Sequence, residues 1–447
     1  MHLWGIVALV GLAILSFLTD WNLVSKSGSI DYRNRVTGAR LLLSGIDPYH
    51  YKWQPGDPAA WCDLYDNPKL PISKTTVTPA MLLLAAPAAL LPYPYSQRVW
   101  LVVEWAMLAG LWFLWWRNGR KSPGSAGHPR PGRRTRAEDV ADYLAATDAA
   151  CSSTGSRWWW AGLVSAFTFT LAWRHHIDRG QVYIVFVALF GLWLQLSLSK
   201  SSTKPWIPGF LAGILVCLRP PLLLFTAPFI LLRRRSQWLG AVIGLAIGLI
   251  APMVFKPKVW IDYAKAMSEW SEVYRSGEQP RPGAREFPPA IEGMTLDHLA
   301  SYQVPQYTDS SLFRLLRDAG WPQVPDKPVL ATLVLLFAAW VWCNRKTADA
   351  AFLLGLAAWA FLSDAFLPAY RNPYNDVMIL NVVALIPILG SRLRLHRALV
   401  VASLALGILM VNILPPARWW IYLPTLATAT LAVLAVLQTA RPKVELN

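Results

Sequence analysis

Repeated apolar runs of bilayer-spanning length constrain this chain most. A transmembrane helix needs ~20 mostly apolar residues, and 55% of the 447 residues are apolar. We expect crossings at residues 3–18, 99–116, 158–173, 182–198, 206–218, 221–232, 238–254, 329–343, 350–367, 376–390, 398–414 and 420–437. The sequence therefore predicts an all-α polytopic membrane protein, with about 12 transmembrane helices in one integral domain, residues 1–447.

A shorter apolar run at residues 78–91 contains Pro87. Two full crossings at 78–91 and 99–116 would put the most basic loop of the chain outside, which would contradict the positive-inside rule. We therefore interpret 78–91 as a half-membrane or re-entrant segment. Irregular backbone at membrane depth is tolerated only against protein or a water-filled cavity, so this segment suits the wall of an active site.

The distribution of charge predicts the topology. The chain has 42 Lys and Arg against 26 Asp and Glu, and the excess lies in short loops between apolar runs, as the positive-inside rule predicts. This pattern indicates membrane lipids, and not nucleic acid, as the partner of the basic residues. We expect a basic, flexible cytoplasmic loop at 117–157, external loops at 19–78 and 255–328, and location in the cytoplasmic membrane.

The first polar stretch, residues 29–53, predicts an interfacial helix in the first external loop. Ser29 is a candidate N-cap, Asp31 lies in the first turn, and Gly45 ends the helix. One face is apolar and is expected to point toward lipid: Tyr32, Val36, Ala39 and Leu43. Asp31 would then be a fixed carboxylate just outside the bilayer.

Four polar clusters fall on the external side of this topology. The first is Asp31 with Arg33, Arg35 and Arg40, and the second is residues 174–181. The third is Arg219-Pro220-Pro221, where the chain breaks between two apolar runs, and the fourth is residues 370–376. Ionisable residues at membrane depth are costly, so their convergence indicates a site. A carboxylate facing several arginines and tyrosines suits a substrate that carries a phosphate and a hydroxyl to be activated.

Other interpretations of these residues remain open. Asp31 would also serve as an ordinary first-turn acid that complements the helix dipole, and Arg219 would also reach the interface without a substrate. His175 and His176 are adjacent, a spacing that does not favour a metal site. The rival classes of function are a transporter or lipid-linked sugar flippase, and a membrane scaffold without chemistry.

Three motifs in order resemble the C-type glycosyltransferases. They are D-Y-x₆-A-R-x₄-G-I-D-P-Y at residues 31–49, T-P-A-M-L-L-L-A-A-P at 78–87, and R-G-Q-V-Y at 179–183. The chain resembles most closely the polyprenyl-phosphate-sugar-dependent bacterial enzymes of glycosyltransferase family 87, which include mannosyltransferases. The usual Tyr-Pro-Pro before the half-membrane segment is Val77-Thr78-Pro79 here, and no second aspartate lies two residues before Asp31.

The resemblance implies a GT-C fold and an inverting hexosyltransferase of cell-envelope glycan synthesis. It would move a mannose-like hexose from a polyprenyl-phosphate sugar to a lipid or glycan acceptor on the outer face, without a metal or another cofactor. Asp31 is the implied catalytic base. The donor-phosphate candidates are Arg219, Arg35, Arg40 and Arg371. The substrate-binding candidates are His175, His176, Asp178, Gln181, Tyr370 and Tyr374.

Overall fold

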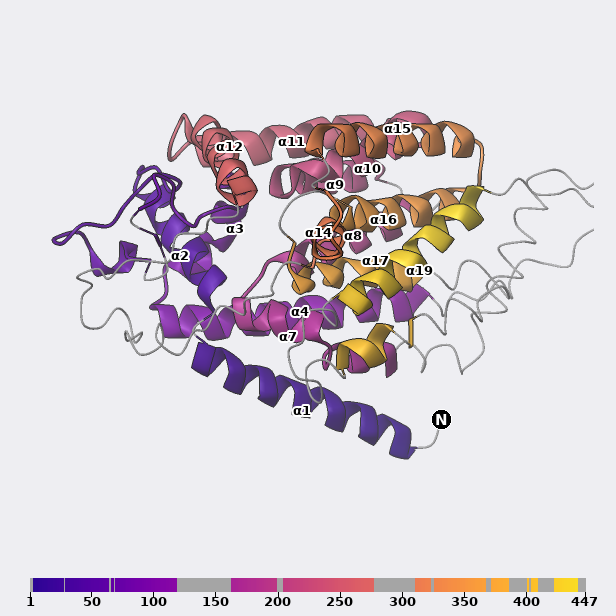
Figure 1. Ribbon diagram of the computed structural model, residues 1–447, viewed down its shortest axis with the longest axis horizontal. Coiled ribbons are helices and arrows are strands. Elements are labelled where there is room, and N and C mark those ends of the chain that lie inside the picture. The colour runs from indigo at the N-terminus through magenta and orange to yellow at the C-terminus, as the bar shows by residue number, and fades with distance from the viewer. Residues whose placement is uncertain are drawn as a thin grey trace, which may run out of the picture.

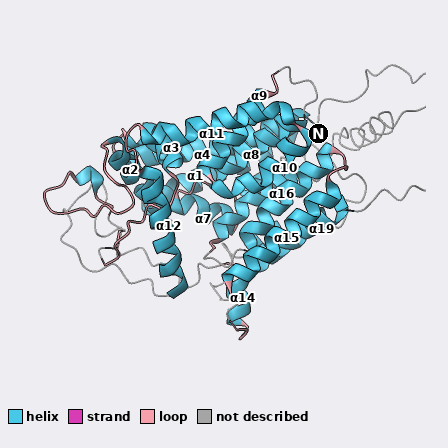
Figure 2. Ribbon diagram, turned by 90° about the horizontal axis from the view of Figure 1, so that it is seen from above, coloured by secondary structure: helices cyan, strands magenta, loops and turns pink. Residues whose placement is uncertain are grey.

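The described part of the protein is a bundle of helices. The computed structural model describes residues 3–27, 29–63, 66–67, 69–118, 162–198, 204–276, 310–322, 325–366, 371–385, 400–401, 403–408 and 422–440. Within these residues the regular structure is helical and there is no strand (Figure 2). The predicted all-α class is confirmed.

Four described helices are long and apolar enough to cross a membrane, or five if the bent pair α7 (Leu171–Arg179) and α8 (Tyr183–Leu198) forms one span. The four are α1 (Leu3–Ser27), α4 (Tyr93–Asn118), α11 (Trp238–Met253) and α15 (Asp326–Asn344). Shorter helices complete the bundle: α8 (Tyr183–Leu198), α9 (Trp206–Leu218), α10 (Leu223–Arg233), α16 (Asp349–Ala365), α17 (Ile379–Leu385) and α19 (Tyr422–Ala440). The total of twelve crossings stays a prediction.

Helices α9 and α11 pack through small residues. A Cβ added to Gly213 on α9 would lie 2.2 Å from the Ala241 carbonyl oxygen of α11, and one added to Gly209 would lie 2.0 Å from the carbonyl oxygen of Gln237, the residue before α11. A Cβ added to Gly240 or Gly244 on α11 would likewise lie within about 2.2 Å of backbone carbonyl oxygens of α9. Small residues allow helix backbones to approach closely where lipid replaces water, because association there depends on van der Waals contact.

One end of the bundle carries a cap made of α2 (Ile30–Leu43), α3 (Pro79–Ala89), α12 (Val259–Ser276) and the loop between α2 and α3. Figures 1 and 2 both place these elements together, away from the end where α15 passes into α16. The cap has its own apolar core, which includes Leu42, Tyr49, Ile72 and Trp270. Trp270 on α12 also donates its indole N–H to the Ser73 carbonyl at 2.9 Å. This core holds α2 against α3, α12 and the loop within the cap.

The prediction that α2 lies on the membrane surface with one side toward lipid is wrong. Tyr32 and Val36, expected to face lipid, are 0% exposed, and Arg33 on the opposite side is buried as well. Arg33 is stabilised inside the protein by the Cys62 carbonyl, which accepts from its Nη2 at 2.9 Å. Helical periodicity identifies an apolar face, but it does not distinguish lipid from a protein core.

The N-terminus of α2 also differs from the prediction. Ser29 has a left-handed backbone with φ 46° and its side chain makes no capping bond to the helix. Instead, its hydroxyl accepts a hydrogen bond from Gln97 on α4 at 3.1 Å, and its carbonyl accepts one from the Tyr93 hydroxyl at 3.0 Å. Contacts with α4, and not a local cap, therefore position the start of α2 and Asp31.

The polar stretch 174–181, predicted as a loop, is largely helix α7 (Leu171–Arg179). The Thr170 hydroxyl caps its start by accepting from the Trp173 N–H, and Gly180 ends it with φ 61°. Helix α8 follows at an angle of 115°. Arg174 forms an ion pair with the buried Asp20, which lies on α1 beyond the predicted end of the first span.

Basic residues lie at the end of the bundle that is away from the cap. Arg233 and Arg234, at the end of α10, bind the two carboxylate oxygens of Asp349 at 2.9 Å and 2.6 Å. Asp349 begins α16, whose start lies at the end of the bundle away from α2 (Figure 1). The loop predicted at 117–157 lies outside the described residues from residue 119 onward, and the central part of the loop predicted at 255–328, residues 277–309, lies outside them as well.

Candidate active site

The Asp31 carboxylate lies where the cap meets the bundle. It receives a hydrogen bond from the side-chain amide of Gln181, which follows α7. The Arg179 guanidinium lies 3.8 Å from its other oxygen. The Asp31 side chain is 22% exposed, so it is held in place and still accessible from outside.

Arg35, one turn after Asp31 on α2, orients that amide. Its guanidinium donates to the Gly180 carbonyl and to the Oε1 of Gln181, each at 2.5 Å. Because Oε1 is the acceptor of this bond, the Nε2 of Gln181 faces Asp31. Burial lowers the pKa of Arg35 below its ordinary value, and the negative charge of Asp31 acts in the opposite direction.

Gly180 permits the close contact between α7 and α2. Its φ of 61° is in the left-handed region, which favours glycine. A Cβ at this position would also lie 2.5 Å from the Cβ of Tyr32 and 3.0 Å from that of Ser29. A side chain at residue 180 would therefore push Gln181 away from Asp31.

Lys74 is a second basic residue near Asp31 that the sequence did not indicate. It lies in the loop before α3, and burial lowers the pKa of its ammonium below the ordinary 10.5. The carboxylates of Asp63 and Asp31 act in the opposite direction, while the charge of Arg179 lowers the pKa further. Lys74 thus interacts electrostatically with Asp31, Asp63, Asp66 and Arg179.

Arg219 occupies the predicted break in the chain, which is confirmed. It ends α9 with an extended backbone, φ −145°, before the short helix η2 (Pro220–Leu222). Its Nη2 lies 2.6 Å from an oxygen of Asp364 on α16, and its Cζ lies 4.7 Å from the centre of the Tyr183 ring. The side chain is 17% exposed. Arg219 therefore combines a fixed position with partial access from outside.

Arg371 binds the same carboxylate, Asp364, as Arg219 does, and its side chain is 2% exposed. Its guanidinium binds Asp364 at 3.1 Å and Asp376 at 2.7 Å. Its remaining Nη1 donates to the Ser310 and Thr425 hydroxyls at 3.2 Å and 3.3 Å. Every nitrogen of the guanidinium thus has a protein partner. This position differs from the expected role in donor binding and gives Arg371 a structural one.

Arg40 is likewise engaged by the protein. Its three guanidinium nitrogens donate to the carbonyls of Ala89, Ala60 and Leu91 at 2.8 Å, 3.0 Å and 2.8 Å. These bonds fasten α2 to the loop at Ala60 and to the end of α3. Arg40 therefore supports the cap, in place of the expected contact with a donor phosphate.

The aromatic ring of Tyr374 connects the two groups of charged residues. It stacks on His175 and packs against Tyr183, with ring centroids 5.4 Å apart in both pairs. Tyr183 in turn lies beneath Arg219. The Asp31 group and the Arg219 group are therefore neighbours, joined by aromatic side chains.

The remaining substrate-binding candidates are His176, Asp178 and Tyr370, and they differ in how far they are buried. His176 is 0% exposed, stacks on Trp173, and has its Nε2 3.2 Å from Glu104 on α4, so it belongs to the interior and not to the substrate site. Asp178 is partly exposed on α7. Tyr370 lies outside the described residues.

Asp364 is a functional candidate that the sequence analysis missed. It binds both Arg219 and Arg371, and the side-chain amide of Asn375 donates to it at 3.0 Å. Its signal in the sequence is a lone acid within the apolar run 350–367, and such acids are costly unless they are paired.

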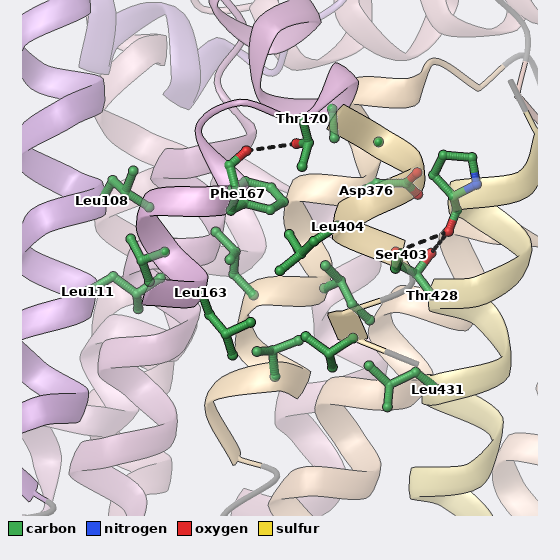
Figure 3. A pocket seen from close by; sticks show the side chains of 18 of the residues that line it. Leu108, Leu111, Leu163, Phe167, Thr170, Asp376, Ser403, Leu404, Thr428 and Leu431 are labelled. Atoms are coloured by element: carbon green, nitrogen blue, oxygen red, sulfur yellow. Dashed lines mark hydrogen bonds between the residues drawn. The ribbon is translucent and has the colours of Figure 1, made fainter. Parts of the chain in front are cut away.

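An apolar cavity opens beside the Arg371 network (Figure 3). Its wall is formed by α4, residues 163–172, α17, residues 400–407 and α19. Side chains such as Leu108, Phe167, Leu404 and Leu431 line it, and Asp376 is the acidic residue on its wall. The cavity thus joins apolar space within the bundle to the polar cluster around Arg371.

Comparison with known proteins identifies a family. Residues 76–368 match glycosyltransferase family 87. The matched region contains α3, Gly180-Gln181, Arg219 and Asp364, begins after Asp31 and ends before Arg371. Comparison with curated proteins and with solved structures finds no match. The family match spans more than half of the chain, and together with the apolar helices it identifies this protein as a multi-pass membrane glycosyltransferase of glycosyltransferase family 87.

Proposed function

We propose that the protein transfers a mannose-like hexose from a polyprenyl-phosphate sugar to a lipid or glycan acceptor with inversion, on the outer face of the cytoplasmic membrane. The observation that carries this proposal is the Asp31 carboxylate, held by Gln181 and next to Arg179 while still partly exposed. A general base must be both positioned and accessible to the hydroxyl from which it removes a proton.

In the proposed reaction, the acceptor oxygen attacks the anomeric carbon of the hexose from the face opposite the phosphate. The bond between that carbon and the phosphate oxygen breaks, and the electron pair leaves with the polyprenyl phosphate. Asp31 takes the proton of the acceptor hydroxyl as the new bond forms. A single displacement of this kind inverts the configuration of the anomeric carbon.

Arg219 is the best candidate for the donor phosphate. Negative charge grows on the leaving phosphate in the transition state, and a fixed guanidinium stabilises it. Arg219 already forms an ion pair with Asp364 and stacks near Tyr183, so its position is set before the donor binds. Arg35 contributes positive charge from the interior, although its bonds to Gly180 and Gln181 give it a positioning role as well.

The apolar cavity supports a lipid-linked donor. Its wall is formed mainly by leucine, valine and aromatic side chains within the bundle (Figure 3). An isoprenoid chain bound there would keep its apolar surface away from water. Asp376, Arg371, Asp364 and Arg219 form a continuous series of ion pairs from the cavity wall to the proposed phosphate position.

The distribution of charge supports the proposed outer-face location. The contact of Arg233 and Arg234 with Asp349 lies at the end of the bundle away from α2 (Figure 1). Basic clusters favour the cytoplasmic side, and this supports placing the α2 end, with Asp31, outside.

A transfer assay tests the proposal. Purified protein is incubated with radiolabelled polyprenyl-phosphate mannose and a membrane-lipid extract, and the label in the glycolipid product and its anomeric configuration are determined. We expect labelled product with inverted configuration. Transfer from a nucleotide sugar only, or retention of configuration, would contradict the proposal.

A further inference from the structure

The break after α9 leaves a backbone carbonyl without its helical donor. The last helical bond of α9 runs from the Arg219 N–H to the Leu215 carbonyl at 2.8 Å. In a continued helix the Leu218 carbonyl would accept from the N–H of Leu222, but that N–H donates to the Arg219 carbonyl at 2.9 Å. The two residues between are prolines and have no N–H to offer. Because Leu218 is only 5% exposed, its carbonyl needs a donor from another segment.

Thr78 supplies this donor from the start of α3. Its hydroxyl donates to the Leu218 carbonyl at 3.2 Å, and it accepts from the Met81 N–H at 3.2 Å, which caps α3. Thr78 is 3% exposed, so both bonds are shielded from water. One buried hydroxyl thus links the start of α3 to the end of α9.

The bond from Thr78 fixes the backbone on one side of Arg219. The Leu218 carbonyl and the Arg219 N–H belong to one planar peptide unit, which Thr78 holds at its oxygen and Leu215 holds at its nitrogen. The bond from Leu222 holds the carbonyl of the next unit. The two peptide planes beside a Cα atom set its φ and ψ, so these three bonds fix the extended backbone of Arg219 and the direction of its side chain. Of the three, the bond from Thr78 is the one that comes from a distant segment.

The segment that carries Thr78 is also attached to α2. The Thr75 hydroxyl donates to the Asn34 carbonyl at 3.3 Å, before α3 begins. Arg40 on α2 donates to the Ala89 carbonyl at 2.8 Å, where α3 ends. Residues 75–89 therefore connect the helix that carries Asp31 to the chain break at Arg219.

We propose that Thr78 is a positioning residue for donor binding, whose hydroxyl fixes the direction from which Arg219 meets the donor phosphate. This inference rests on the proposed function, in which Arg219 binds that phosphate. A guanidinium binds a phosphate best through two parallel N–H bonds, so its orientation matters as well as its charge. Thr78 acts through the backbone of Arg219 and not by touching the donor.

Two substitutions test this role. Thr78→Val keeps the shape of the side chain and removes the hydroxyl, whereas Thr78→Ser keeps the hydroxyl. Loss of the bond to the Leu218 carbonyl should raise the donor KM about three- to tenfold in Thr78→Val and leave the acceptor KM unchanged. Thr78→Ser should have the native donor KM. A raised donor KM in Thr78→Ser equal to that in Thr78→Val would overturn the inference, because the hydroxyl would then not be the cause.

Thr439→Val is the matched control. Thr439 is buried near the end of α19, where its hydroxyl accepts from the Trp340 indole N–H at 3.2 Å and donates to the Val436 carbonyl at 2.7 Å. This variant also loses one bond from an N–H and one bond to a carbonyl. Both valine variants should lower Tm, and Thr78→Val alone should raise the donor KM. Equal donor KM values in the two variants would overturn the inference.

A double-mutant cycle with Arg219→Ala tests whether Thr78 acts through Arg219. The measurement is equilibrium binding of radiolabelled polyprenyl-phosphate mannose to the purified protein. In the Arg219→Ala background, Thr78→Val should weaken this binding by less than about twofold, because the group that it positions is gone. An equal loss of binding in both backgrounds would show that Thr78 acts independently of Arg219 and would overturn the inference.

Equilibrium binding also separates this inference from the proposed reaction, because donor binding does not require transfer. If the native protein transfers no mannose but the binding results of the cycle are as expected, the proposed reaction fails and the role of Thr78 stands. If transfer occurs and Thr78→Val binds the donor as the native protein does, only the inference about Thr78 fails.

Discussion

The side-chain amide of Gln181 donates a hydrogen bond to the Asp31 carboxylate across 150 positions of sequence. The orientation of this amide is set by Arg35, which donates to its oxygen. The carboxylate therefore meets a fixed donor from α7 on one side and is open to an acceptor on the other.

Gln181→Glu places a second carboxylate against Asp31 with almost no change in shape. A like charge raises the pKa of a carboxyl, so the Asp31 base would be lost to protonation at a higher pH. The acidic limb of kcat/KM should move upward by about one pH unit. Gln54→Glu, at an exposed loop position, adds the same charge elsewhere and should leave the profile unchanged. Superimposable profiles for the native protein and Gln181→Glu would remove Gln181 from the site.

Gly180→Ala tests the close contact between α7 and α2. A non-glycine residue at positive φ costs about 1–3 kcal/mol, and here its Cβ also meets Tyr32. The displaced Gln181 should lower turnover on the order of 10–100-fold. Gly56→Ala carries a similar backbone strain at φ 105° with no atom within 4 Å, so it should lower Tm and leave turnover unchanged. Equal turnover in the two variants would contradict the geometric account.

Arg219→Ala tests the donor phosphate. Loss of a charge-assisted contact should raise the donor KM or lower turnover about 10–100-fold, and Arg219→Lys should retain part of the activity, because it keeps the charge and loses the guanidinium fork. Arg98→Ala, an exposed arginine on α4, is the control. Donor KM and turnover are measured with the acceptor saturating. Native values in Arg219→Ala would exclude Arg219 from donor binding.

Much of the organisation was accessible from the sequence. Apolar runs predicted the helical class, and Arg219-Pro220-Pro221 predicted the break between α9 and η2, because proline restricts the residue before it and cannot donate within a helix. The motif order placed Asp31 and Gly180-Gln181 in one site, and the structure brings these residues into contact. Their roles in the reaction stay predictions.

The features that the sequence did not reveal depend on distant partners. Helix α7 looked like a polar loop because Arg174 is satisfied by Asp20, which lies 154 positions earlier. Helix α2 looked interfacial because the core that covers Tyr32 comes from other segments, Trp100 among them. Asp364 carries no motif, and only the fold shows that it forms an ion pair with Arg219.

The most direct test of the account is the turnover of Asp31→Asn, measured in purified protein whose donor binding has first been confirmed. The amide keeps the shape of the side chain, so donor binding should persist. If Asp31 is the general base, turnover should fall on the order of 10²–10⁴-fold. If Asp31 only complements the dipole of α2, the change should cost about 0.3–1 kcal/mol of stability and leave turnover nearly intact. Near-native turnover with normal donor binding would contradict the central claim.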